Sequence, residues 1–154
     1  PFRGIVPHWA VSVGAAEVEV DRETGIVKLL KYVSVTDVGK ALNPVVARSQ
    51  VDSGAIMGLG NTFYEETVYG DGQMLNGSDM EYRLPLLEDM PDQWHSLMLE
   101  NNDGPGPFGS KGMAQTSIVV IAPAVGNAIY DAVGIRIHDL PITPEKVLRG
   151  LGKL

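Results

Sequence analysis

The fold class is decided by a stretch that reads WAVSVGAAEVEV at residues 9–20, DRETG at 21–25 and IVKLLKYVSV at 26–35. Apolar or small residues alternate with others on both sides, and the polar interruption has the composition of a turn. The stretch therefore predicts a β-hairpin. Charged side chains are seldom buried without a partner, so those of the hairpin are expected on its solvated face. They are Glu17, Glu19, Lys28 and Lys31.

A long helix is predicted after the hairpin. Asn43 followed by Pro44 is typical of the N-cap and first turn of a helix, which is expected to run to about Thr67. Its three glycines each cost about 1 kcal/mol relative to alanine, so another backbone or a ligand is expected to approach them closely. These glycines are Gly54, Gly58 and Gly60.

A second long helix and several strands complete the order. Residues 115–133 are rich in Ala, Ile and Val and predict a helix buried on most sides, with a kink or a late start at Pro123. Thr143 and Pro144 open a short last helix. The whole predicts an α+β fold with a mixed β-sheet, two principal helices and glycine-rich loops. The predicted strands after the hairpin cover 74–76, 81–87 (an edge strand or strand end, because of Pro85), 94–99 and 135–137.

Composition excludes several classes of function. The 154 residues fit one domain, and 12 Lys and Arg against 19 Asp and Glu argue against nucleic acid or an anionic membrane as partner. No cysteine is present, which excludes disulfides and iron–sulfur ligation within this chain. No apolar run of about 18 residues is evident and residues 1–4 do not form a signal peptide, so no membrane span and a cytoplasmic location are expected. The missing initiator Met indicates a fragment of a longer protein.

The most informative loop reads GPGPFGSKGMAQ at residues 104–115. Its glycines let backbone amides approach a ligand, its prolines stiffen it, and the helix that follows attracts an anion. It departs from a nucleotide-binding P-loop, because Ser110 stands between Gly109 and Lys111. The loop is typical of phosphate or pterin recognition, but also of a surface loop with Lys111 in solvent. Gln50, one turn before the glycines of the first helix, fits either a ligand contact or a surface residue.

Other reactive side chains form no recognisable site. His8, His95 and His138 lack the spacing of a metal pair, so structural or surface roles are predicted for them. Ser110 has no histidine close in sequence, which disfavours a hydrolase triad. Neighbouring acids usually point apart, so those of this chain are expected in solvent. They are Glu65, Glu66, Glu88 and Asp89.

Five motifs follow one another along the chain: AEVEVDRETG at 16–25, DVGKALNP at 37–44, QVDSGAIMGLG at 50–60, GPFGSKG at 106–112 and LPITPE at 140–145. In this order they resemble the second molybdopterin-binding domain of the xanthine dehydrogenase and aldehyde oxidase family. The resemblance covers nearly the whole chain, and five ordered motifs are far more specific than one. It implies that residues 1–154 are a single-domain fragment from the C-terminal part of the molybdopterin-binding subunit.

The resemblance also implies an activity and partners. It implies a molybdenum hydroxylase that oxidises a heteroaromatic ring or an aldehyde with water as oxygen source, through attack by a metal-bound hydroxide and hydride transfer to a sulfido ligand. The cofactor would be molybdopterin, alone or as a dinucleotide, with molybdenum. The partners would be the remainder of the subunit, iron–sulfur and FAD domains or subunits, and a small-molecule substrate. The fragment would not be active alone.

The resemblance places the pterin between two loops. The cofactor contacts that it implies are Leu42, Asn43, the amide of Gln50, and the backbone of Lys111, Gly112, Met113 and Ala114 up to Gln115. None would ligate molybdenum, because in the family the pterin sulfurs do.

Gln115 departs from the family pattern, which has a glutamate four residues after the lysine as the catalytic base. A carboxamide cannot serve as a base near neutral pH. Three explanations remain open: another residue acts as base, the substrate assists its own deprotonation, or the protein binds cofactor without the standard chemistry. The last describes a non-catalytic cofactor-binding or assembly module.

Overall fold

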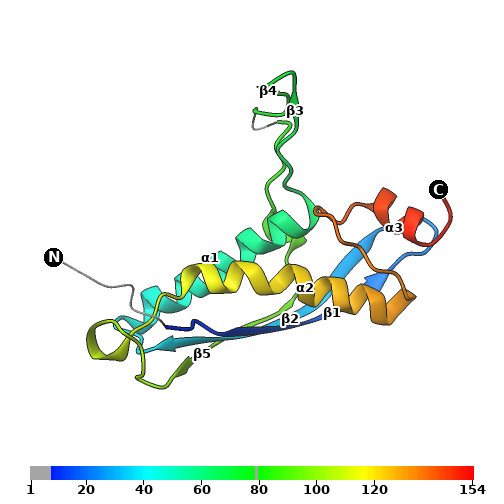
Figure 1. Ribbon diagram of the computed structural model, residues 1–154. Coiled ribbons are helices and arrows are strands. Elements are labelled where there is room, and N and C mark those ends of the chain that lie inside the picture. The colour runs from blue at the N-terminus through cyan, green and yellow to red at the C-terminus, as the bar shows by residue number, and fades with distance from the viewer. Residues whose placement is uncertain (1–7, 79) are drawn as a thin grey trace.

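The computed structural model describes residues 8–154 except residue 79, so residues 1–4, on which the signal-peptide expectation rests, lie outside the described residues. A three-stranded mixed sheet carries the helices α1 and α2 side by side on one face (Figure 1). The α+β class with two principal helices is therefore confirmed. The sheet contains β1 (Ser12–Val20), β2 (Val27–Gly39) and β5 (Gln93–Glu100), and the helices are α1 (Pro44–Phe63), α2 (Ala114–Val133) and the short α3 (Pro144–Gly150). A separate two-stranded sheet joins β3 (Tyr69–Gly70) to β4 (Gln73–Met74).

The predicted hairpin is formed by β1 and β2, which pair antiparallel. The Asp21 carboxylate accepts a hydrogen bond from the N–H of Glu23 at 2.8 Å, and Gly25 adopts a φ of 76°, which closes the turn. β5 then pairs with β2 in parallel, so the strands that end at Gly39 and Glu100 finish at the same edge of the sheet. The loops that follow these two strands consequently emerge side by side.

Helix α1 begins as predicted and ends earlier than predicted. The Asn43 side chain accepts a hydrogen bond from the N–H of Val46 at 3.2 Å, which is an N-cap. The helix ends at Phe63 rather than near Thr67, because the N–H groups of Tyr64 and Glu65 both return to the carbonyl of Gly60.

Close backbone approach explains two of the three glycines in α1. A Cβ at Gly54 would lie 2.5 Å from the carbonyl oxygen of Ala114, and a Cβ at Gly58 would lie 2.5 Å from that of Ile118. Both carbonyls belong to α2, so the two helices pack backbone against backbone. This packing compensates for the low helix propensity of the two glycines.

Replacing Gly58 with Val is expected to destabilise the protein by about 1–3 kcal/mol, because the side chain would be forced into the α2 backbone and the Ile121 side chain. The measurement is the midpoint of chemical unfolding for the intact protein. Gly126 on α2, where a Cβ meets nothing within 4 Å, is the matched control, and its replacement with Val should cost far less. Equal losses at both positions would contradict the packing described here.

Two predicted strands and one predicted helix start are wrong. Residues 81–87 form no strand, because side chains rather than a β-ladder hold this segment: the Tyr82 hydroxyl donates to Glu65 at 2.9 Å and the Leu86 N–H donates to Asp89 at 2.8 Å. Residues 135–137 form no strand either, since their alternation arises from packing of Ile135 and Ile137 on the helical core. Helix α2 continues through Pro123 instead of starting there.

The segment Pro107–Val133 is long and apolar enough to cross a membrane by length and composition, which the sequence expectation overlooked. One side of it packs inside the domain, where Ile121, Val125 and Ile129 are fully buried between α1 and the sheet. The core helix of a folded domain meets the same test of length and composition.

Candidate functional site

Two cavities that share Met113 contain all the predicted cofactor contacts. The first has a volume of about 280 Å³ and the second about 360 Å³. Segments that lie more than 60 residues apart in sequence therefore meet at one place, at the edge of the sheet where β2 and β5 end. Leu42, Asn43, Gln50, Lys111 and Met113 line the first cavity, and Gly112, Met113, Ala114 and Gln115 line the second.

Backbone contacts hold the loop after β2 against the loop after β5. The N–H of Lys111 donates to the carbonyl of Val38 at 3.0 Å, and the N–H of Asn102 donates to the carbonyl of Gly39 at 2.9 Å. Gly39 has a φ of 63°, and a Cβ there would lie 2.2 Å from the carbonyl oxygen of Gly109. Only glycine satisfies both the positive φ and the close approach. The two loops thus form one stacked unit.

The Lys111 side chain ties this unit together from within. Its ammonium lies 2.6 Å from Asp37 and 2.6 Å from Asp103, and the side chain is only 6% exposed. Lys111 is therefore not in solvent, which removes the surface-loop interpretation of this residue. With two carboxylates engaging its ammonium, what Lys111 presents to the first cavity is mainly its backbone and carbon stem.

The charge on Asp37 is held by its hydrogen bonds. Burial raises the pKa of the Asp37 carboxyl, but hydrogen bonds from Lys111, the Gly39 N–H and Asn101 outweigh it and leave the pKa below its usual range. Hydrogen bonds to Asp103 and then Asp37 raise the pKa of Lys111. Both groups are charged near neutral pH, and they join residues 74 positions apart.

The second cavity lies at the N-terminus of α2. Met113 is the N-cap residue and supplies no side-chain cap, while the hydroxyls of Thr116 and Ser117 donate back to carbonyls. The first backbone N–H groups of α2 are thus left for a ligand or solvent, and the helix dipole favours negative charge there. A Cβ at Gly112 would meet nothing within 4 Å. The cavity therefore has donors and open space beside the backbone.

Sequence reasoning missed two residues of this site. His8, for which a structural or surface role was predicted, lines the second cavity together with Gln115. Asp37 was noted only as part of a motif, although it organises both loops. Neither has a local signal, because each meets its neighbours only through long-range folding.

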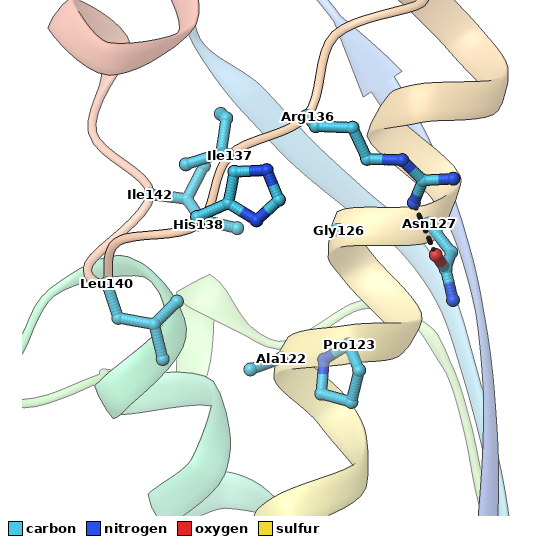
Figure 2. A pocket seen from close by; sticks show the side chains of 9 residues that line it. All are labelled: Ala122, Pro123, Gly126, Asn127, Arg136, Ile137, His138, Leu140 and Ile142. Atoms are coloured by element: carbon cyan, nitrogen blue, oxygen red, sulfur yellow. Dashed lines mark hydrogen bonds between the residues drawn. The ribbon is translucent and has the colours of Figure 1, made fainter.

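A third hollow, of about 320 Å³, lies elsewhere and holds none of the predicted contacts. It lies between α2 and residues 136–142, and Figure 2 shows the His138 ring in the space above Gly126. Arg136 donates to Asn127 at 2.8 Å and its guanidinium lies 3.8 Å from the ring centroid of Tyr130. These contacts fasten the C-terminal segment to α2.

The sequence profile of the molybdopterin cofactor-binding domain family matches residues 4–91. Over 153 residues the chain is 33% identical to a probable hypoxanthine oxidase of Escherichia coli K12, covering 97% of this chain and 16% of that protein. Over 134 residues it is 34% identical to the aldehyde oxidoreductase molybdenum-binding subunit of the same organism, covering 86% of this chain and 18% of that subunit. The chain thus spans less than a fifth of the length of either relative.

Solved structures show the same fold. The aldehyde oxidoreductase of Desulfovibrio gigas superposes with a TM-score of 0.82 at 28% sequence identity, covering 93% of this chain and 15% of that one. The arrangement of sheet, paired helices and loops is therefore one that occurs inside a much longer polypeptide.

Proposed function

This chain belongs to the molybdopterin cofactor-binding domain family, and from that premise we propose that it forms one wall of the cofactor site in a molybdenum hydroxylase. The substrate class proposed is an aldehyde or a heteroaromatic ring. The observation that carries the proposal is the meeting of residues 42–50 with residues 111–115 around two adjoining cavities. The resemblance to xanthine dehydrogenase and aldehyde oxidase subunits, first drawn from five motifs, agrees with the relatives found.

The residues present fit a pterin. A pterin ring carries amide-like donors and acceptors and its side chain carries a phosphate, so it requires polar groups along one edge and an anion site at one end. Asn43 and Gln50 supply polar side chains beside the first cavity, and the start of α2 supplies backbone N–H groups at the second. The open space at Gly112 lets a flat molecule approach the backbone.

Each group in the proposed site has a definite task. When bound, the molybdenum cofactor supplies the oxygen-transfer and redox chemistry. Leu42 covers an apolar surface, Gln50 donates and accepts through its amide, and the backbone from Lys111 to Ala114 fixes the orientation. Asp37 and Lys111 keep the two loops in register from behind the binding surface. No residue of this chain is assigned as a metal ligand.

Gln115 sets the limit of this assignment. It lines the second cavity, at the position where a base would act, but its carboxamide cannot take a proton near neutral pH. This observation favours a second candidate function, a cofactor-binding or assembly module without the standard chemistry. Iron–sulfur and FAD domains or subunits remain proposed partners under the catalytic reading.

Filling the open space at Gly112 tests the proposed site. In the intact protein, Gly112→Leu is expected to lower molybdenum and pterin content per chain about tenfold or more, because the side chain would occupy the cavity in which the pterin is proposed to lie. Thermal stability should change little, since a Cβ at this position meets nothing within 4 Å.

Gly126→Leu is the matched control. Gly126 also has open space at its Cβ, but it lines the hollow between α2 and residues 136–142 (Figure 2). Cofactor content should stay at the wild-type level in this variant. Cofactor lost from the Gly126 variant and retained by the Gly112 variant would place the pterin in the wrong cavity and refute the proposal.

A further inference from the structure

The outer face of the three-stranded sheet is divided into an apolar half and a charged half. Helices α1 and α2 cover the other face, and within residues 8–154 without 79 no element covers this one (Figure 1). The strand register shows which side chains share it, because alternate residues of a strand point to the same side. The division follows from reading the rows of paired residues along the sheet.

The apolar half lies at the edge where β2 and β5 end. One row pairs Val13 with Val35 and Val35 with Leu97 across the three strands. Leu99 extends it on the next row, and Ala15 and Val33 on the row before. Val13 is 65% exposed, Leu97 52% and Leu99 54%. Large aliphatic side chains side by side and this exposed are unusual on a free surface.

The charged half lies at the opposite end of the same face. Glu17 pairs across the strands with Lys31, and Glu19 pairs with Lys28. Opposite charges that face each other in this way are stable in water and gain little from being covered. The same sheet face thus presents one half suited to solvent and one half suited to a protein partner.

The apolar half adjoins the proposed cofactor site. β2 leads from Val35 through Gly39 into the loop that carries Leu42 and Asn43, and β5 leads from Leu99 into the loop that carries Lys111. A structure that packs on the apolar half therefore reaches the open side of the site without crossing the charged half. The two cavities there are open to the surface, and another wall is needed to enclose a ligand.

We propose that the apolar half of the outer sheet face, centred on Val13, Val35 and Leu97, is the surface on which the remainder of the molybdopterin-binding subunit packs to complete the cofactor site. This inference rests on the proposed function, which supplies that remainder as the partner. Its length supports the choice, since the chain spans only 16–18% of the two E. coli relatives. The charged half stays in solvent.

Cysteine labelling of the intact protein tests this surface. Leu97→Cys and Lys28→Cys are made separately, and the rate of maleimide labelling of each is measured by mass spectrometry of peptides. This chain has no cysteine of its own, so a label in its peptides reports only the introduced position. Both sites are exposed in the structure described here, on the same face and on neighbouring strands. Covering by the remainder of the subunit should slow labelling of Leu97→Cys by about tenfold or more relative to Lys28→Cys.

Three outcomes decide the proposal. Slow labelling of Leu97→Cys that persists on dilution to a single copy supports it. Equal rates at the two positions overturn it, and so does protection that disappears on dilution, since a second copy would then be the occupant. Molybdenum and pterin are measured in the same samples: protection without cofactor would refute the proposed function alone, and cofactor without protection would refute this surface alone.

Discussion

Replacing Gln115 with Glu in the intact enzyme is expected to raise its rate of hydroxylation about 100- to 10,000-fold, which is the usual contribution of a general base. The side chains have nearly the same shape, but only the carboxylate can take up a proton near neutral pH. Gln115 is exposed and lines the second cavity, so the substitution should fit without repacking. The measurement is turnover of a panel of aldehydes and nitrogen heterocycles by cofactor-loaded protein.

Gln50→Glu is the control for this gain. It adds the same negative charge to the neighbouring cavity, at a position proposed to hold the pterin and not to move a proton. Its rate should not rise. An unchanged rate for Gln115→Glu, with full cofactor content, would contradict a lost base and favour the cofactor-binding or assembly module, or a base supplied from elsewhere.

Asp37→Ala is expected to lower molybdenum and pterin content by about 10- to 100-fold, the range seen when a residue that orients ligands from behind is removed. Asp37 is the common acceptor for Lys111, Asn101 and the N–H of Gly39, so its loss releases both loops from each other. Lys111 would keep only Asp103, which is largely exposed. Cofactor content per chain is measured together with the thermal midpoint.

Glu100→Ala is the matched control for Asp37→Ala. The Lys40–Glu100 pair also joins the end of β2 to the end of β5, but its two side chains are 45% and 33% exposed. Exposed pairs contribute little, so this variant should keep its cofactor. Equal loss in both variants would show that any charge at this edge of the sheet suffices, and would contradict the role given to Asp37.

The ion pair also predicts a pH dependence. Because the pKa of Asp37 is lower in the folded protein than in the unfolded chain, the pair adds stability above the unfolded pKa and loses it as the pH falls through the folded pKa. The difference in thermal midpoint between wild type and Asp37→Ala should therefore shrink as the solution is made more acidic than the usual aspartate range.

Local patterns in the sequence predicted much of the fold. The hairpin, the Asn43 cap and the last helix at Thr143 each depend on residues within a few positions of one another, and each was confirmed. The glycines of α1 also predicted a close neighbour, although not which segment would supply it. The predicted strand at 135–137 failed because an alternating pattern also arises where a segment packs along a helix.

Long-range pairing was beyond local reasoning. Nothing near Trp94 shows that β5 pairs in parallel with β2, yet this pairing brings the two loops together. The Asp37–Lys111 pair and the position of His8 beside Gln115 depend on the same folding. The candidate site was therefore predicted through a family resemblance, and the structure shows that its residues lie at one place.

Electron density for the intact protein with its cofactor tests the central claim most directly. The account predicts a pterin lying between residues 42–50 on one side and residues 111–115 on the other, in contact with the open space at Gly112. A pterin bound away from both stretches, with the cavities at Met113 filled only by solvent or by other side chains, would contradict it.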